Sequence, residues 1–388
     1  MLRIALIGTG GIADAHLTAY QQFAGRCEVA AITDIFPDKA VEKKKKFGLS
    51  CDTFDDYKKL LGRSDIDLVS VCTPPYTHAE IAMDFLNAGK NVIVEKPMSS
   101  SLRECDAMID AAHRSGKILS VISQNRFQDP MMRLKRVLES GLAGRIVHAQ
   151  VDSHWWRGHS YYDLWWRGTW EKEGGGCTLN HAVHHIDIFQ WMMGMPKRVQ
   201  ATMNNTSHDN AEVEDLSIAV LSYPDGALAQ ITSSVVHHGQ EQQLIFQGMK
   251  ARVSVPWKVY ASSSKENGFP EENTDLEREI DGYWSSVPGL IHVGHAGQID
   301  DVMTAIEKGS RDILVTGAEG RKTLELITAI YQASSTGQTV ELPLGKDSPF
   351  YTREGIMSHA PKFYEKKKSV EGFEKNDITV GGDYGVKK

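Results

Sequence analysis

Residues 2–17 read LRIALIGTGGIADAHL, and this stretch decides the fold of the first part of the chain. Its opening apolar run, residues 2–8, has the length and composition of a buried parallel strand. A glycine turn and a predicted helix follow, which is the order found in dinucleotide-binding units. In such units the turn and the helix N-terminus meet a pyrophosphate. The residues that we expect at this contact are Gly8, Thr9, Gly10, Gly11 and Ile12.

An acidic residue, Asp34, directly follows the next strand-like run, residues 27–33. A carboxylate in this place accepts the hydroxyls of an adenosine ribose and repels a 2′-phosphate. Ile35 follows it, so the next residue offers no guanidinium to bind a 2′-phosphate. We therefore expect NAD rather than NADP as the cofactor, with Lys39 as the cation that could weaken this preference.

The first 123 residues alternate short apolar runs with helical patterns. Strands are predicted at 67–72, 91–94 and 118–122, and helices at 79–88 and 102–115. This alternation predicts a doubly wound parallel sheet over residues 1–123. Ligands bind at the carboxyl ends of the strands in such sheets. The residues near these ends that we expect to contact the cofactor are Thr73, Pro74, His78, Glu95, Lys96 and Gln124.

The pattern changes after this sheet. A helix at 130–139 and a strand at 145–153 precede about five strand-like runs between residues 197 and 255, with no helical pattern among them. These runs predict a large, open, mainly antiparallel sheet. With helices at 298–308 and 318–335 they form an α+β domain over 124–343, for substrate binding and oligomerisation. Residues 344–388 are rich in lysine and glycine, and we expect an arm or a poorly ordered end.

Residues 174–194, GGGCTLNHAVHHIDIFQWMMG, place titratable groups near the start of an otherwise apolar helix that ends at Gly194. Such a helix either delivers these groups into a pocket or carries them as surface and capping residues. Two of them have the i, i+4 spacing of a metal pair, but nicotinamide chemistry needs no metal and we predict none. The groups are His181, His184, His185 and Asp187.

Residues 155–170, WWRGHSYYDLWWRGTW, are crowded with aromatic rings and arginines. Rings as dense as these can belong to a core. Interleaved with polar donors, they also suit a sugar site, where flat faces stack on C–H groups and donors bind hydroxyls.

Composition narrows the class of protein. There are 43 basic and 50 acidic residues, a net charge of -7, so no broad basic face for nucleic acid is expected. The lysines at 43–46 are expected to be the solvated face of a surface helix. Five cysteines without a CxxC pair indicate a reducing compartment. The N-terminal apolar run is too short to span a membrane and has no cleavage pattern, so we expect a soluble cytoplasmic protein.

Four motifs together resemble the Gfo/Idh/MocA family: GTGGIA at 8–13, EKP at 95–97, WRGTW at 166–170, and the glycine–histidine pattern at 174–187. This family comprises sugar and cyclitol dehydrogenases with an N-terminal Rossmann domain and a C-terminal domain built on an open sheet. The resemblance covers about residues 1–343. It implies that Lys96 contacts the nicotinamide ribose and the substrate, before a cis bond to Pro97.

The resemblance also implies that His184 is the general acid/base, and that Trp166 and Arg167 lie near the nicotinamide. Asn180 stands where inositol-type members often have aspartate. Asparagine at this position resembles the sugar-nucleotide and glycoside 3-dehydrogenases of the family, and it puts simple cyclitol oxidation in doubt. The implied substrate contacts are Lys96, Arg126, Tyr161, Asn180, His184 and His295.

Alcohol oxidation needs a proton acceptor with a pKa near the operating pH and a cation for developing alkoxide charge. His184 and Lys96 fit these two roles. We predict hydride transfer between NAD and a ring secondary hydroxyl, such as C3, of a sugar, glycoside or sugar derivative. The alternatives are a redox-assisted glycosidase, in which oxidation at C3 acidifies the neighbouring proton, and a non-catalytic ligand sensor. An exposed sheet face favours a homodimer or homotetramer.

Overall fold

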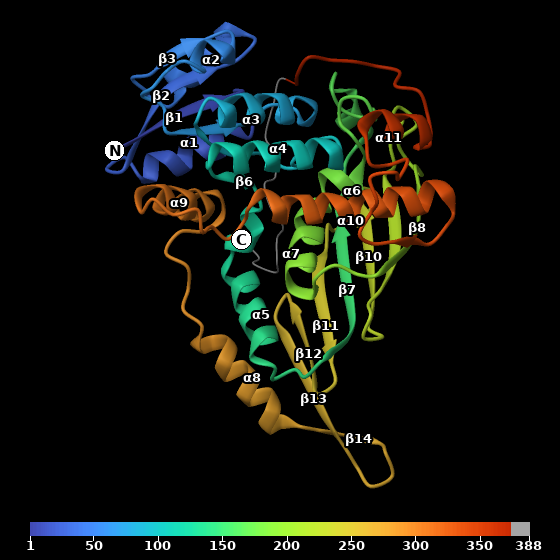
Figure 1. Cartoon of the computed structure of the whole chain (residues 1–388). Coiled ribbons are helices and arrows are strands. Elements are labelled where there is room, and N and C mark those ends of the chain that lie inside the picture. Colours follow the sequence, from blue (N-terminus) through green and yellow to red (C-terminus); the bar gives the residue numbers. More distant parts are fainter. Residues whose placement is uncertain (374–388) are drawn as a thin grey trace.

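Six parallel strands form the N-terminal sheet in the computed structural model, which describes residues 1–373 (Figure 1). Their spatial order is β3 (Asp52–Phe54), β2 (Cys27–Thr33), β1 (Leu2–Ile7), β4 (Leu68–Val71), β5 (Asn91–Val94) and β6 (Leu119–Val121). The order reverses between β1 and β4, which leaves a crevice at the carboxyl ends of these two strands. The helices between the strands are α1 (Ala13–Gln22), α2 (Pro37–Lys46), η1 (Tyr57–Leu60), η2 (Pro75–Thr77), α3 (His78–Asn87) and α4 (Leu102–Ser115).

The first turn requires glycine. Gly8 has a φ of 91°, and a Cβ added there would lie 2.8 Å from the carbonyl oxygen of Cys72. A side chain would therefore push the turn after β1 away from the end of β4. The apolar strands themselves are confirmed as buried, because residues Ile4 to Ile7 of β1 are all covered.

The second sheet has nine strands and is mainly antiparallel, as predicted; its one parallel pair is β7 with β10. The five predicted runs correspond to β8–β12. The spatial order is β14 (Pro270–Glu272), β13 (Lys258–Ser264), β12 (Ala251–Val255), β11 (Gln242–Gly248), β7 (Ile146–His154), β10 (Leu228–Ser234), β9 (Leu216–Ser222), β8 (Arg198–Asn204) and β15 (Val340–Glu341).

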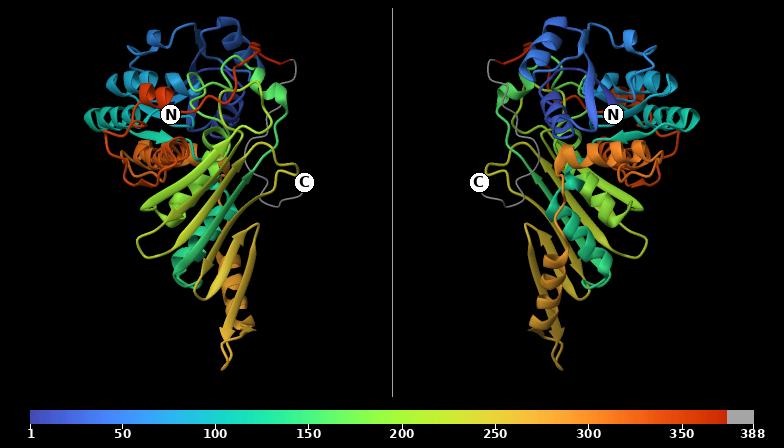
Figure 2. Two further views of the ribbon diagram at one scale, coloured as in Figure 1. Left: turned by 90° about the vertical axis from the view of Figure 1, so that its right-hand side faces the viewer. Right: turned by 90° about the vertical axis from the view of Figure 1, so that its left-hand side faces the viewer.

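Helices cover one face of this sheet (Figure 2). They are α5 (Asp129–Ser140), α7 (Val183–Met193), α8 (Thr274–Ser286) and α10 (Gly317–Thr336). On β9, buried residues alternate with exposed ones, as expected for a strand with one covered face. The exposed positions of the outer face include apolar residues, among them Ile218, Val220 and Leu228.

The segment between residues 256 and 293 was not predicted from the sequence. It contains β13, β14 and α8, which project from the rest of the protein (Figure 2). β14 is exposed along its whole length, and Ile280 is the buried residue of α8. β13 and β14 are too exposed to show an apolar pattern, whereas Leu276, Ile280 and Trp284 of α8 have a helical spacing that could have predicted this helix.

Helix α9 (Gly294–Glu307) lies after the predicted division of the chain at residue 123 but packs against the N-terminal sheet. It packs beside α1, and its buried face joins the core of the N-terminal sheet rather than that of the second sheet (Figure 1). Ile299 and Met303 of α9 share this core with Ile4 and Tyr20. An apolar helix face fits either sheet, so periodicity alone could not assign it.

The tail also differs from the expectation. Residues 344–373 pack onto the protein through α11 (Arg353–His359) and through Phe350 and Tyr351, which are buried. The remainder of the predicted poorly ordered end, residues 374–388, lies outside the described residues. In the part of the chain that the structure describes, no helix is both long enough and apolar enough to cross a membrane.

Candidate active site

The carboxylate of Asp34 is fixed beside the glycine turn. The backbone amide and the hydroxyl of Thr9 both donate to its Oδ2, at 2.8 and 2.6 Å, and the amide of Phe36 donates to its Oδ1 at 2.9 Å. A Cβ added at Gly10 would meet no heavy atom within 4 Å, so the backbone there is open to a ligand. An open turn next to a held carboxylate fits the pyrophosphate and ribose of a dinucleotide.

The cation that the fold brings to this turn is Lys43. Its ammonium donates to the carbonyl oxygen of Gly10 at 3.5 Å and pairs with Asp14, and its side chain is 12% exposed. The expectation of a solvated lysine run is therefore wrong at this position. Lys39 instead places its ammonium 4.4 Å from the ring centre of Phe36.

His78 was predicted to contact the cofactor, and the structure places its side chain between two loops of the N-terminal sheet. Its ring is fully buried, with its two nitrogens 2.9 Å from the carbonyl oxygen of Pro97 and 2.8 Å from that of Thr73. It joins the loops after β4 and β5 and so positions Thr73 and Pro74.

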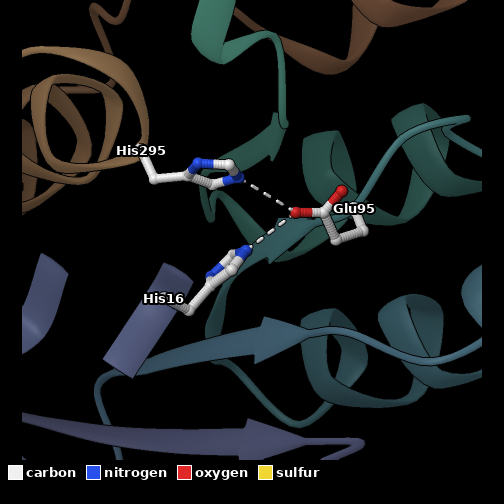
Figure 3. Close-up of side chains that lie close together, drawn as sticks. All are labelled: His16, Glu95 and His295. Carbon is white, nitrogen blue, oxygen red and sulfur yellow. Dashed lines mark hydrogen bonds and ion pairs between the residues drawn. The ribbon is translucent and has the colours of Figure 1, made fainter. Parts of the chain in front are cut away.

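Glu95 is the centre of a buried hydrogen-bonded chain (Figure 3). His16 Nε2 lies 2.9 Å and His295 Nε2 lies 3.4 Å from the same carboxylate oxygen. Ser70 Oγ contacts both His16 Nδ1 and the hydroxyl of Tyr20, at 3.3 and 2.6 Å. Burial alone would raise the pKa of Glu95, but the hydrogen bonds from the two histidines outweigh it and the pKa lies well below its usual value.

This chain changes the predicted roles of Glu95 and His295. The His295 ring returns to the N-terminal sheet as the resemblance implied, but it faces Glu95. The other carboxylate oxygen of Glu95 accepts from the backbone amide of Lys96 at 3.2 Å. The buried carboxylate and its two histidines thus hold the backbone of the residue that precedes Pro97.

Lys96 lies between the two domains. The peptide bond before Pro97 is cis, as the resemblance implied. The Lys96 ammonium donates to the carbonyl oxygen of Asn180 at 3.2 Å. Burial lowers the pKa of Lys96 from its ordinary value.

A small cavity lies at the carboxyl ends of β5 and β6, and Lys96 and His184 both line it. Burial, and then the charge of Lys96, hold the pKa of His184 well below its usual value. The pair thus combines a neutral imidazole on His184, which can accept a proton, with a cation on Lys96. Other polar residues in the lining are Ser123, Asn125, Asp187 and Thr323.

The predicted glycine–histidine helix is two helices, α6 (Cys177–Asn180) and α7, with a break at His181 and Ala182. The i, i+4 pair is divided by this break. His185 turns to the second sheet, where its Nδ1 lies 2.8 Å from Ser153 Oγ. Within residues 1–373, the group of three side chains with the spacing of a metal site is His16, Glu95 and His295 instead.

Arg126 does not have the substrate-facing position that we expected. Its side chain is fully buried, and Nε and Nη2 each donate to one carboxylate oxygen of Asp187 at 2.8 Å. Its Nη1 donates to Glu319 at 3.0 Å. Arg126 therefore ties α7 to α10 and to η3 (Gln124–Phe127), and Gln124 is likewise buried in this turn.

The side chain of Asn180 holds the glycine turn. Its amide nitrogen donates to the carbonyl oxygens of Gly175 and Gly176, at 2.8 and 3.3 Å. Glu214 accepts from the amides of Gly176 and Thr178, at 2.9 and 3.0 Å. A Cβ at Gly176 would lie 1.8 Å from the carbonyl oxygen of Glu214, so this position admits no side chain.

Residues 155–170 form the active-site loop, which includes η4 (His159–Asp163). The guanidinium of Arg167 lies 4.1 Å from the ring centres of both Tyr161 and Trp166. Glu173 accepts from Arg167 Nη1 at 2.7 Å and from the amide of Gly168 at 2.6 Å. This stack places the predicted Tyr161, Trp166 and Arg167 together.

Sequence reasoning missed His16, Glu173 and Glu214. The signal for His16 was a histidine on the buried face of α1 beside Leu17 and Tyr20. Glu214 had no local signal, because the amides that it binds lie 38 and 36 residues away in the chain. Glu173 binds Arg167 and Gly168, six and five residues before it, but this spacing matches no regular element and so gave no pattern.

Comparison with known proteins agrees with this geometry. Residues 2–123 match the oxidoreductase family Gfo/Idh/MocA with its NAD-binding Rossmann fold, and residues 131–254 match the C-terminal domain of that family. Both predicted domain types and the NAD cofactor are thereby confirmed.

Individual relatives are more distant. The D-glucoside 3-dehydrogenase of Escherichia coli K12 is 26% identical over 361 residues, 88% of this chain and 97% of that protein. The 2,7-anhydro-N-acetylneuraminate hydratase of Mediterraneibacter gnavus is 26% identical over 307 residues, 76% of this chain and 79% of the hydratase. The WlbA dehydrogenase structure from Bordetella pertussis, in complex with NADH and UDP-GlcNAcA, has a TM-score of 0.76 at 28% identity, covering 89% of this chain and 98% of WlbA.

Proposed function

Since this chain belongs to the Gfo/Idh/MocA family of oxidoreductases, we propose that it oxidises or reduces a ring secondary alcohol, at C3, of a sugar, glycoside or sugar derivative. The observation that carries the proposal is the cavity lined by both Lys96 and His184, whose pKa values are lowered by burial. The C3 position is supported by the relative whose name specifies a D-glucoside 3-dehydrogenase.

The two residues divide the proton chemistry. His184 is neutral because burial and the charge of Lys96 hold its pKa well below the usual value, so its ring can accept the hydroxyl proton of the substrate. The negative charge that develops on the alcohol oxygen beside the ring would favour the protonated form and so raise that pKa toward the operating pH. The Lys96 ammonium, held against the carbonyl oxygen of Asn180, stabilises the negative charge that develops on the alcohol oxygen. NAD, when bound, supplies the hydride acceptor at nicotinamide C4.

The test is a panel of free sugars, glycosides and sugar nucleotides with NAD, read as NADH absorbance. We expect one class to give NADH in stoichiometric amounts with the ketone product. A panel that yields neither NADH nor any changed sugar would contradict the proposal.

A second candidate is a redox-assisted elimination or hydration that returns the hydride. It is favoured by the similarity to a 2,7-anhydro-N-acetylneuraminate hydratase. Oxidation at C3 would acidify the C2–H bond, loss of that proton would expel the substituent at C1, and water would add to the resulting enone. The hydride held by the bound cofactor would then return to the C3 carbonyl, so that no net oxidation results. Product formation without net NADH, with deuterium from water at the adjacent carbon, would decide for this candidate over net oxidation.

The cofactor preference should depend on Asp34. Like charges ~4 Å apart cost about 1 kcal/mol in water and about 4 kcal/mol at an effective dielectric near 20. We therefore expect Asp34→Ser with Ile35→Arg to shift the ratio of kcat/KM values for NAD and NADP toward NADP by at least about tenfold. The control is Asp38→Ser, at an exposed position of α2. A wild-type enzyme with equal kcat/KM for both cofactors would show that Lys43 or another cation binds the 2′-phosphate of NADP.

The outer face of the second sheet supports a homodimer or homotetramer. Ile218, Val220 and Leu228 expose apolar surface there, which self-association would cover. A monomeric mass by analytical ultracentrifugation would contradict this assembly.

A further inference from the structure

The C-terminal arm, defined here as residues 361–370, lies along the active-site loop. At its start, Trp170 Nε1 donates to the carbonyl oxygen of Pro361 at 2.9 Å. At its end, the amide of Val370 donates to the carbonyl oxygen of Asp163 at 2.8 Å, and the amide of Trp165 donates to that of Val370 at 2.9 Å. The arm and the loop are thus joined on both sides of Lys366, by the indole of Trp170 at one end and by backbone hydrogen bonds of Val370 at the other.

Lys366 makes the central contact of this arm. Its ammonium donates to three carbonyl oxygens of the loop, those of Tyr162, Leu164 and Arg167, at 2.5, 2.9 and 2.9 Å. An ammonium group has three N–H donors, so these carbonyls use all of them. The loop backbone is irregular between these residues, and the ammonium provides hydrogen bonds that a helix or a sheet would otherwise supply.

The neighbouring lysines of the arm make weaker contacts. Lys367 pairs with Asp209 at 2.9 Å, with side chains 62% and 58% exposed. Lys368 pairs with Asp163 at 3.2 Å and is 64% exposed. Exposed ion pairs contribute little, so Lys367 is a matched control for Lys366 on the same arm.

The loop that Lys366 binds contains the stacked side chains of Tyr161, Trp166 and Arg167, which we call the wall of the active site. Arg167 stacks between Tyr161 and Trp166 and lies close enough for its charge to act on Lys96 and His181. The Arg167 carbonyl is one of the three that Lys366 binds. Any shift of the loop backbone therefore moves Arg167 and Tyr161 relative to Lys96.

We propose that Lys366 is a positioning residue, and that the C-terminal arm completes the substrate side of the active site by holding the active-site loop through its backbone. The inference rests on the proposed function in one respect, that the substrate binds against Tyr161 and Arg167. The arm lies outside residues 2–123 and 131–254, the parts that match the family models.

The experiment compares Lys366→Met with Lys367→Met in the full chain. Hydrogen exchange of residues 159–168 should rise about tenfold or more in Lys366→Met and stay unchanged in Lys367→Met. On the substrate identified in the panel, Lys366→Met should lose about tenfold or more in kcat/KM, mainly through KM, because the wall is misplaced while Lys96 and His184 remain. The dissociation constant of NADH should be the same in both variants.

Chemical rescue separates the ammonium from simple packing. In Lys366→Ala, added propylammonium should restore protection of the loop, whereas tetramethylammonium, which has no N–H donor, should not. Unchanged loop exchange in Lys366→Met would overturn the inference. So would a parallel loss of NADH binding, because the effect would then be general unfolding. If the wild-type protein turned over no sugar, the proposed function would fail, and the exchange comparison would still decide whether Lys366 holds the loop.

Discussion

Replacing Lys96 with methionine is expected to lower kcat by about 10³-fold or more, while NADH still binds. Methionine keeps much of the length of lysine but removes the ammonium that donates to the carbonyl oxygen of Asn180. The charge that develops on the substrate oxygen would then have no cation beside it. Stopped-flow absorbance of NADH gives the turnover, and fluorescence titration gives the NADH dissociation constant.

Two further variants sharpen this result. Lys45→Met removes an exposed lysine of α2 and should leave kcat unchanged. Lys96→Arg keeps the charge, but its planar guanidinium does not reproduce a compact ammonium, so we expect it to recover little of the lost activity. Turnover of Lys96→Met within tenfold of the wild type would show that Lys96 takes no part in the chemistry.

Replacing Arg126 with methionine should give the largest loss of stability, about 3–5 kcal/mol in the free energy of unfolding. The guanidinium is fully buried and bound to both carboxylate oxygens of Asp187, so the substitution leaves a buried carboxylate without its cation. Thr323 would remain as a donor to Asp187, at 2.9 Å, but a hydroxyl does not neutralise a charge. Calorimetry should show a melting temperature lower by roughly 10 °C.

A double variant tests the reason for this loss. Arg126→Met with Asp187→Leu removes both buried charges, and it should recover much of the stability that Arg126→Met loses. Glu319 tolerates the change because it keeps Lys322 as a partner, at 2.7 Å, near the surface. Arg136→Met, which breaks an exposed pair with Glu139, is the surface control and should cost little. A double variant as unstable as Arg126→Met would show that packing against Trp191, not the charge, is what the arginine supplies.

The N-terminal sheet and its turn could be predicted because their signals are local. Gly8 stands directly after an apolar strand, and Asp34 stands at the end of the next one. Both lie at the carboxyl edge because parallel strands end at the same edge of a sheet. The parallel sheet followed from the same part of the chain, and the cis bond before Pro97 followed from its resemblance to a known family.

The histidine helix shows where local reasoning was insufficient. Periodicity predicted one helix, whereas the structure has a break at His181 and Ala182, which sets His181 apart from His184 and His185 of α7. His184 faces the cavity and His185 faces the second sheet. A two-residue break changes the face of a helix without changing its apolar composition, so the sequence pattern could not reveal it.

The amino-acid sequence by itself determined the elements whose apolar period is strong and the motif residues that stand at their ends. The tertiary structure alone decided the partners of charged groups. Arg126 was expected at the substrate, but it binds Asp187 and Glu319, and Lys366 was expected in a loose tail, but it holds the active-site loop. These pairings join residues far apart in the chain, and an isolated charge carries no information about which distant group will lie beside it when both are buried.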